Sequence, residues 1–140
     1  AELDGKDIFW GVWINNMFDF GSTRYFSGVL NAGLGGFDHT TLKDIYYLYR
    51  ALWNSSSPTL HIKGKARQYS TSTAQTVRFY SSAAKPVLTI NGDTVATHRL
   101  GPCLFVSDTI QMRGSNAIAV SADGASDSTT LTIGNLLKHR

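Results

Sequence analysis

Three acidic side chains stand where acid–base chemistry could take place. Asp19 closes the most apolar stretch of the sequence, Asp38 precedes His39, and Glu2 is the only glutamate. An Asp–His pair suggests general acid–base work, but adjacent residues on a loop seldom converge on one substrate atom. Asp38 more simply orders the entrance of the helix that follows it. Asp19, which opens a Gly-Ser segment, is more typical of a turn cap.

Other kinds of site find little support. The histidines His61, His98 and His139 lie far apart and lack the spacing of metal ligands, so we expect no metal site. No G-x-S-x-G motif supports a Ser-His-Asp triad, and nothing in the sequence predicts a cofactor. The single Cys103 cannot form an internal disulfide.

The charges and the hydropathy exclude further classes of partner. Thirteen Lys and Arg against ten Asp and Glu give a net charge of +3, and the basic residues are scattered, so we expect no nucleic-acid partner. Lys63, Lys65 and Arg67, spaced by two, predict one solvated strand face. No apolar window is long enough for a membrane span and no signal peptide is recognisable, so we expect a soluble protein without a membrane partner.

The first third of the sequence predicts one strand and one helix. Ile8–Phe20 is rich in β-branched and aromatic residues, as in a parallel strand buried on both faces, and Gly21–Gly36 is punctuated like a loop. Thr41 is a suitable N-cap with Asp44 at the third helical position, and apolar residues at helical spacing predict an amphipathic helix to about Trp53. One such βα unit cannot bury its own faces, so we expect parallel neighbours.

From residue 59 onward the apolar period changes to two, which predicts a small antiparallel sandwich. Asn91-Gly92 between two apolar runs predicts a tight hairpin, because type I′ turns need positive φ at both central positions. Further turns are predicted at 113–116 and 122–125. The expected strands are 60–62, 76–80, 87–90, 94–98, 104–112, 117–120 and 129–133. The predicted fold class is therefore mainly β, an immunoglobulin-like β-sandwich preceded by one strand and one amphipathic α-helix.

Three segments occur in an order and spacing that resemble a known family. Trp10–Phe20 reads WGVWINNMFDF, Gly33–Asp38 reads GLGGFD, and Lys43–Trp53 reads KDIYYLYRALW. They resemble W-G-x-x-x-W-N-M-F-D-F, G-L-x-x-x-D and K-D-x-[YF]-Y-x-Y-[KR]-x-x-W, which close the (β/α)8 barrel of glycoside hydrolase family 2. Weaker patterns at 77–82, 87–92 and 114–120 resemble the family's next domain. The chain is similar to the C-terminal part of a β-galactosidase-like enzyme, the last β/α unit of the barrel plus the following sandwich.

The resemblance implies that both catalytic glutamates belong to earlier barrel strands. Retaining glycosidases need two carboxylates about 5 Å apart, and Glu2 lies outside any strand-end motif. Asn15 stands where the family has a sugar-stacking tryptophan, so an amide replaces the aromatic platform. The weak catalytic candidates are Asp19, Asp38 and Glu2, and the sugar-binding candidates are Trp13, Asn15, Asn16 and Asp19.

The expected organisation is a barrel-derived segment at 1–58, the sandwich at 59–135 and a tail at 136–140. We expect a non-catalytic, structural or carbohydrate-associated part of a glycosidase whose parent enzyme could be secreted or periplasmic. A stand-alone carbohydrate-binding module and a small glycosidase with a carboxylate site at an oligomer interface remain alternatives. Because the helix tyrosines cannot all face one core, we also expect an exposed aromatic strand and helix through which the chain forms a homo-oligomer.

Overall fold

The computed structural model describes residues 14–22 and 28–134, which form two compact units that divide between Lys43 and Asp44. The predicted fold class, mainly β with a sandwich and one helix, is confirmed. No helix within these ranges is both long and apolar enough to cross a bilayer.

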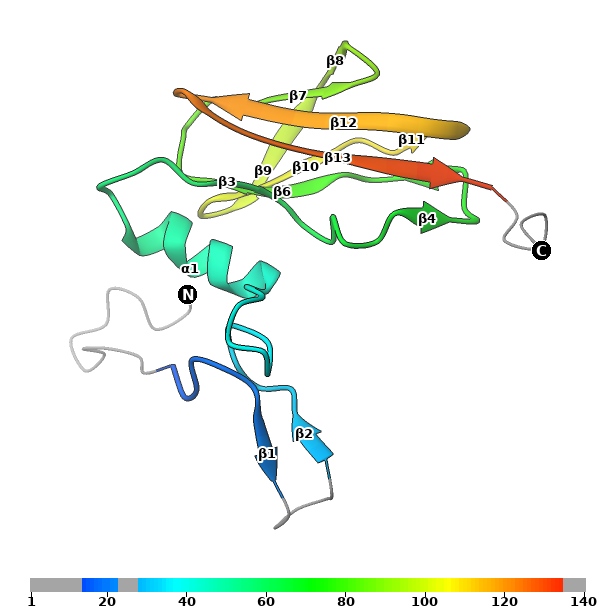
Figure 1. The fold of residues 1–140 in the computed structure, drawn as a ribbon. Helices are drawn as coiled ribbons and strands as arrows, with labels where there is room; N and C mark the ends of the chain where they lie inside the picture. Colours follow the sequence, from blue (N-terminus) through cyan, green and yellow to red (C-terminus); the bar gives the residue numbers. More distant parts are fainter. Residues whose placement is uncertain (1–13, 23–27, 135–140) are drawn as a thin grey trace. The chain divides into compact units, whose positions relative to one another are not determined.

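The second unit is built on a sandwich of two β-sheets (Figure 1). One sheet has four strands, in the order β3 (Leu60–Ile62), β6 (Arg78–Ser81), β10 (Leu104–Ser107) and β9 (Thr97–Gly101). The other has five, in the order β4 (Tyr69–Ser70), β13 (Ala125–Ile133), β12 (Gly114–Ala122), β7 (Val87–Ile90) and β8 (Asp93–Val95). A short ladder joins β5 (Ala74–Gln75) to β11 (Ile110–Gln111). Among these pairings only that of β4 with β13 is parallel.

The core lies between the two sheets and follows the alternation that a period of two predicts. In β12, Asn116, Ile118 and Val120 are buried, whereas the residues between them are more exposed. Phe79 of β6 and Phe105 of β10 stack with 5.5 Å between their ring centroids. Removing these apolar side chains from water is the main favourable contribution to the stability of the sandwich.

Two of the three predicted turns are confirmed. Asn91 and Gly92 have φ of 52° and 89° and join β7 to β8. Asp123 and Gly124 have φ of 47° and 78° and join β12 to β13, with Ala122 opposite Ala125. The turn predicted at 113–116 is wrong, because residues 114–116 already pair with β13. The polar residue Asn116 instead stabilises the start of β12, because its side chain donates to three backbone carbonyls.

Several strand bounds differ from the prediction. Segment 76–80 begins as a strand only at Arg78, 94–98 divides between β8 and β9, and 104–112 divides between β10 and β11. The strands β4 and β5 were not predicted. Lys63–Arg67 is a turn and not a strand, closed by the bond from Arg67 N to Gly64 O at 2.9 Å, with Gly64 at a φ of 73°.

The helix α1 (Asp44–Trp53) ends where the sequence predicts but starts later. Thr41 is not its N-cap, because the backbone N–H of Thr41 donates to the carboxylate of Asp38 at 2.9 Å and its carbonyl accepts from Gly36. Leu42 forms a bridge with Gly35. The residues before Asp44 therefore belong to a loop with its own hydrogen bonds.

The helix packs on the outer face of the four-stranded sheet through His61 of β3. This imidazole is 3% exposed, and its Nε2 lies 2.7 Å from Asp44 Oδ1. The Tyr47 ring stacks on it at 3.8 Å, almost parallel. Farther along α1, Cys103 Sγ donates to Ala51 O, and burial raises the pKa of this thiol.

The first unit contains a short antiparallel hairpin, β1 (Phe20–Ser22) with β2 (Gly28–Leu30). The predicted buried parallel strand is therefore wrong over its described part, since residues 14–17 form no strand and Phe20 is 38% exposed. Residues 8–13 lie outside the described residues. A buried parallel strand needs a partner on each edge, and within the described ranges only the single bridge of Phe18 with Gly35 is parallel there.

Replacing the anchoring imidazole tests how the helix is held. We expect His61→Ala to lower the free energy of unfolding by about 2–3 kcal/mol, because it removes a partly buried hydrogen bond to a carboxylate and a ring stack. Urea unfolding followed by circular dichroism measures this change. The matched control is His98→Ala. The His98 side chain is 58% exposed, and its Nδ1 lies 3.8 Å from a carboxylate oxygen of Asp108, which is also exposed, so this pair is weak. Its effect should stay within about 0.5 kcal/mol, and equal losses in the two variants would contradict the anchoring role.

Candidate functional site

Asp19 is buried in the first unit and is held by hydrogen bonds to one of its carboxylate oxygens. Its residue is 6% exposed, and its Oδ1 accepts hydrogen bonds from Gly33 N at 2.9 Å and from Lys43 Nζ at 2.6 Å. Lys43 Nζ also contacts Asn31 Oδ1. The bond from Lys43 lowers the pKa of Asp19 below its ordinary value, burial acts in the opposite direction, and Gly33 N–H adds to the lowering. The carboxylate is therefore ionised and acts as a structural clamp.

Asp38 is exposed and orders the loop before α1. Its Oδ1 accepts from Thr40 N at 3.1 Å and from Thr41 N at 2.9 Å, and its Oδ2 accepts from the Thr41 hydroxyl. These hydrogen bonds hold the pKa of Asp38 far below its usual range, and the bond from the Thr41 hydroxyl has the largest effect. A group held so strongly as an anion is a poor general acid. The ring of its neighbour His39 stacks on that of Phe18, with 4.5 Å between the ring centroids. No side-chain hydrogen bond joins His39 to Asp38 among the described residues.

The amide candidates lie on the segment before Asp19. Asn15 is exposed and Asn16 half-buried, and Asn16 has a φ of 83°. No side-chain hydrogen bond of either asparagine occurs among the described residues. Trp13 and Glu2 lie outside the described residues.

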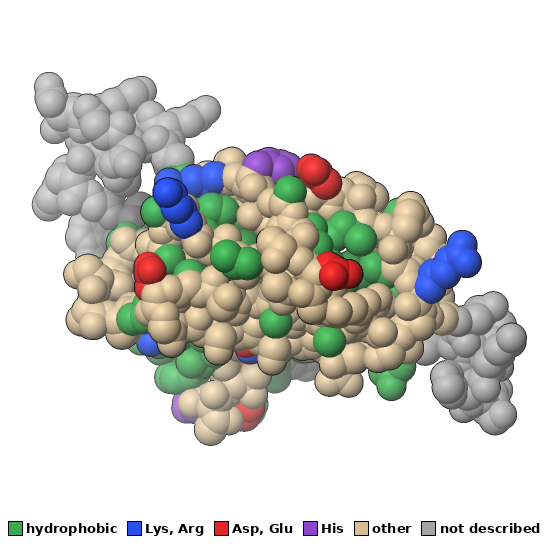
Figure 2. Space-filling model, turned by 90° about the horizontal axis from the view of Figure 1, so that it is seen from above, with side chains coloured by type: hydrophobic (Ala, Val, Ile, Leu, Met, Phe, Trp, Pro, Cys, Tyr) green, Lys and Arg blue, Asp and Glu red, His purple; other side chains and the backbone are tan. Residues whose placement is uncertain are grey.

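The arrangement does not bring two free carboxylates together in the described part of the chain. Asp19 is paired with a lysine, Asp38 caps a turn, and no hydrogen bond joins the two. The described residues also contain no group of three or more His, Cys, Asp or Glu side chains that could hold a metal ion. In Figure 2, charged side chains on the visible face are few and separated by uncharged surface, with no continuous basic stripe.

One titratable cluster was not predicted. His61 lies between Asp44 and Asp127, and Asp127 also accepts from Lys65 Nζ at 2.7 Å. A histidine flanked by Leu60 and Ile62 in a predicted strand was the available signal. Because the imidazole is 3% exposed and stacks under Tyr47 of α1, it is not accessible to a substrate, and the cluster joins α1, β3 and β13.

Comparisons with known proteins show which proteins these elements resemble. No protein-family model matches the sequence. Over 91 residues, 62% of the chain, it is 32% identical to a β-glucuronidase of Bacteroides fragilis and covers 13% of that protein. The FMN-binding β-glucuronidase of Faecalibacterium prausnitzii L2-6 is similar in structure over 85% of this chain and 19% of its own, with a TM-score of 0.74 and 33% identity. The homologues of this chain are glycoside hydrolases of the family 2 kind.

A second solved structure agrees with this assignment. A putative β-galactosidase of Bacteroides fragilis matches 85% of the chain with a TM-score of 0.73 and 26% identity, and the match covers 19% of that protein. The predicted resemblance to family 2 is thus confirmed. This glycosidase-like chain spans between 13% and 19% of the length of the relatives it matches.

The Asp19–Lys43 pair makes a testable electrostatic prediction. In Lys43→Met the pKa of Asp19 should rise, because the main cause of its lowering is removed, whereas the pKa of Asp38 should not move. Carboxyl ¹³C shifts recorded during a pH titration measure both groups, and Asp38 serves as the internal control.

The sign of the pH dependence follows from the lowered pKa. A depressed pKa means that the Asp19 contribution to stability is complete above the ordinary aspartate value of about 3.9 and is lost as the pH falls through the lower folded value. Lys43→Met should bring the folded pKa of Asp19 closer to the ordinary value, so that Asp19 contributes less to the pH dependence of stability. An unchanged Asp19 titration in the variant would show that Lys43 does not set this pKa.

Proposed function

We propose that this chain serves as the barrel-closing segment and adjoining sandwich of a β-glucuronidase- or β-galactosidase-type enzyme, and that it contributes structure rather than the catalytic carboxylates. The observation that carries this proposal is the state of the carboxylates. Asp19 and Asp38 are both committed to structural bonds, and the sequence contains one glutamate, Glu2. Glycoside hydrolysis requires a second free carboxyl group at a fixed distance from the first.

The exposed apolar side chains support a role inside a larger enzyme. Trp53 and Leu52 of α1 are 58% and 40% exposed, although helix faces of this composition are normally covered. The first unit also exposes large apolar side chains, namely Ile14, Met17, Phe20, Val29, Phe37 and Leu42. In our proposal the remaining strands and helices of the barrel cover these residues, and the relatives are long enough to supply them. In the isolated chain, the same surfaces bind a second copy.

Contact with the sugar is the part of the proposal that involves polar groups. Asn15 and Asn16 offer amides without intramolecular partners in the described part of the chain, and an amide can donate to or accept from a sugar hydroxyl. They cannot replace a stacking tryptophan, so we assign them an accessory role at the rim of the sugar site, together with Trp13.

The direct test is hydrolysis by the purified 140-residue chain. With p-nitrophenyl β-glucuronide and β-galactoside, release of nitrophenol should equal that of the buffer blank, because Asp19 and Asp38, the candidate carboxylates that the structure describes, are both engaged in structural hydrogen bonds. Saturable turnover that persists through repurification and disappears in Asp38→Asn would overturn the proposal. It would instead favour a small glycosidase that uses this loop.

The apolar face of α1 provides a second test. Light scattering should show self-association of the isolated chain, and the double variant Leu52→Ser, Trp53→Ser should shift the mass towards the monomer, because burial of apolar surface drives the contact. The control is Val87→Ser, since Val87 of β7 is 44% exposed and belongs to the five-stranded sheet, on which α1 does not pack. A monomeric wild-type chain, or equal dissociation by Val87→Ser, contradicts this use of the helix.

A further inference from the structure

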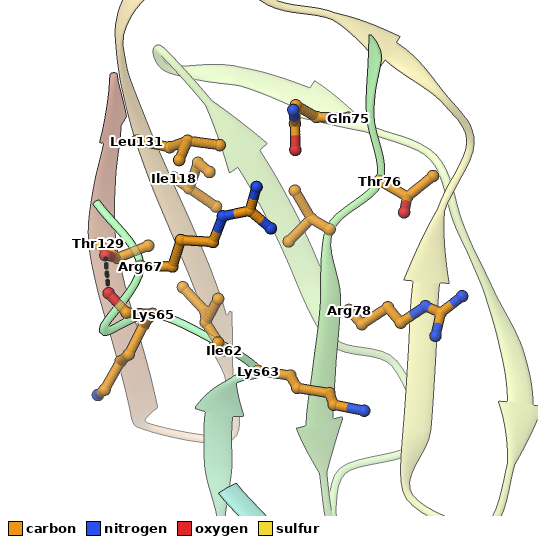
Figure 3. Close-up of a pocket in the computed structure, with 12 residues that line it drawn as sticks. Ile62, Lys63, Lys65, Arg67, Gln75, Thr76, Arg78, Ile118, Thr129 and Leu131 are labelled. Atoms are coloured by element: carbon orange, nitrogen blue, oxygen red, sulfur yellow. Dashed lines mark hydrogen bonds between the residues drawn. The ribbon is translucent and has the colours of Figure 1, made fainter. Parts of the chain in front are cut away.

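The turn that follows β3 borders a cavity of about 170 Å³ at the edge of the sandwich (Figure 3). Its floor is aliphatic and consists of Ile62, Val77 and Ile118 from the core, with Leu131 beside them. Pockets for drug-sized ligands usually start near roughly 300 Å³. The cavity therefore suits an occupant no larger than a single small ring.

Arg67 supplies the charge of this cavity. Figure 3 shows its side chain reaching across the middle of the cavity, with the guanidinium group over the aliphatic floor. Its Nε donates to Tyr69 O over a long 3.4 Å, and within the described ranges no carboxylate forms a salt bridge with it. Lys63 and Arg78 extend away from the cavity in the same view. The terminal N–H groups of Arg67 are therefore free to bind a planar oxyanion.

The backbone that carries Arg67 is fixed in advance. Arg67 N donates to Gly64 O, Thr129 Oγ1 donates to Lys65 O at 3.2 Å, and Lys65 Nζ pairs with Asp127 at 2.7 Å. The last pair also compensates the negative charge of Asp127, the carboxylate bound to this turn from β13. A donor held on an ordered turn loses less conformational entropy when a ligand binds.

Gln75 places an acceptor opposite this donor. Its Nε2 donates to Ser70 Oγ at 2.9 Å and to Ser72 O at 2.6 Å, so that both amide hydrogens are used and the orientation of the amide is fixed. Its Oε1 receives no hydrogen bond in the part of the chain that the structure describes, and in Figure 3 it faces the cavity on the side of Arg67. A ligand that fits this pair carries both an oxyanion and a hydroxyl donor.

We propose that the cavity binds a free hydroxylated carboxylate about the size of one sugar ring, as in a uronic acid. The carboxylate pairs with the guanidinium of Arg67 through two parallel hydrogen bonds. A hydroxyl donates to Gln75 Oε1, and the C–H face of the ring covers the aliphatic floor. The site uses neither Asp19 nor Asp38 and stands independently of the proposed role in a glycosidase.

Amide NMR on the ¹⁵N-labelled chain tests this assignment. Titration with glucuronate should give saturating shifts centred on residues 62–67, 75–78 and 129–131, with a Kd in the millimolar range expected for so small a ligand. Arg67→Gln should raise the Kd about tenfold or more, and Arg67→Lys should raise it less, because lysine keeps the charge but not the fork. Arg113→Gln makes the same substitution at an exposed arginine that does not line this cavity, and should leave the Kd unchanged.

Ligand controls separate the two halves of the proposal. Glucose lacks the charge and benzoate lacks the hydroxyl groups, so both should bind more weakly than glucuronate. Glucose binding as tightly overturns the role of Arg67, and benzoate binding as tightly overturns the role of Gln75. Glucuronate shifts that do not saturate, or that centre on other residues, overturn the site.

The wild-type chain also tests the charge pairing without relying on a variant that folds. Raising NaCl from about 0.05 M to about 0.5 M should weaken glucuronate binding several-fold, because the pair is open to solvent and is screened. Binding that is insensitive to salt overturns the ion pair.

Discussion

One buried imidazole joins the main parts of the second unit. His61 bonds Asp44 in the first turn of α1 and lies 3.8 Å from Asp127 on β13 of the opposite sheet. Asp127 in turn accepts from Ile62 N at 2.8 Å and from Lys65 Nζ on the following turn. Because buried polar groups are stable only when they are paired, the helix, the strand β3 and the turn are fixed together. The cavity beside that turn depends on the same contacts.

The same physical requirement explains the state of the two carboxylates that the structure describes in the first unit. A carboxylate can act as a nucleophile or as a general acid only when its oxygens are free and its pKa suits the reaction. Asp19 meets a lysine and a backbone N–H, and Asp38 meets a hydroxyl and two backbone N–H groups. These partners stabilise the loop by keeping the carboxylates ionised. The two carboxylates that the sequence suggests for acid–base chemistry therefore order the chain instead.

The sequence could predict interactions between residues that lie close together along the chain, but not those between distant residues. The Asn91-Gly92 hairpin depends on the conformations that two adjacent residues allow, and it was predicted correctly. The capping of the loop by Asp38 is also local. The Asp19–Lys43 pair spans 24 residues, and no local pattern indicates it. His61 was visible as a polar residue between apolar neighbours, but its partner Asp127 could be placed only by the packing of the two sheets.

The wrong predictions have the same origin. The apolar stretch up to Phe20 has the composition of a barrel strand, but such a strand is stable only between partners, and the described residues form a short exposed hairpin there instead. The start of α1 was placed too early because Thr41 has a competing hydrogen bond to Asp38. The resemblance to family 2 identified the relatives of this chain correctly, whereas local propensity predicted a strand that the described residues do not form. The family motif comes from whole enzymes, in which such a strand has neighbouring strands.

The edges of the sandwich decide how this chain can meet other chains. The edge strands β3, β4 and β8 have three, two and three residues, and the outward N–H of Ile62 on β3 is occupied by the carboxylate of Asp127. The longer edge strand β9 carries the exposed side chains of His98 and Arg99. Short, occupied or charged edges are poor templates for an added strand. The sheets therefore resist the edge-to-edge pairing that leads to amyloid-like aggregation.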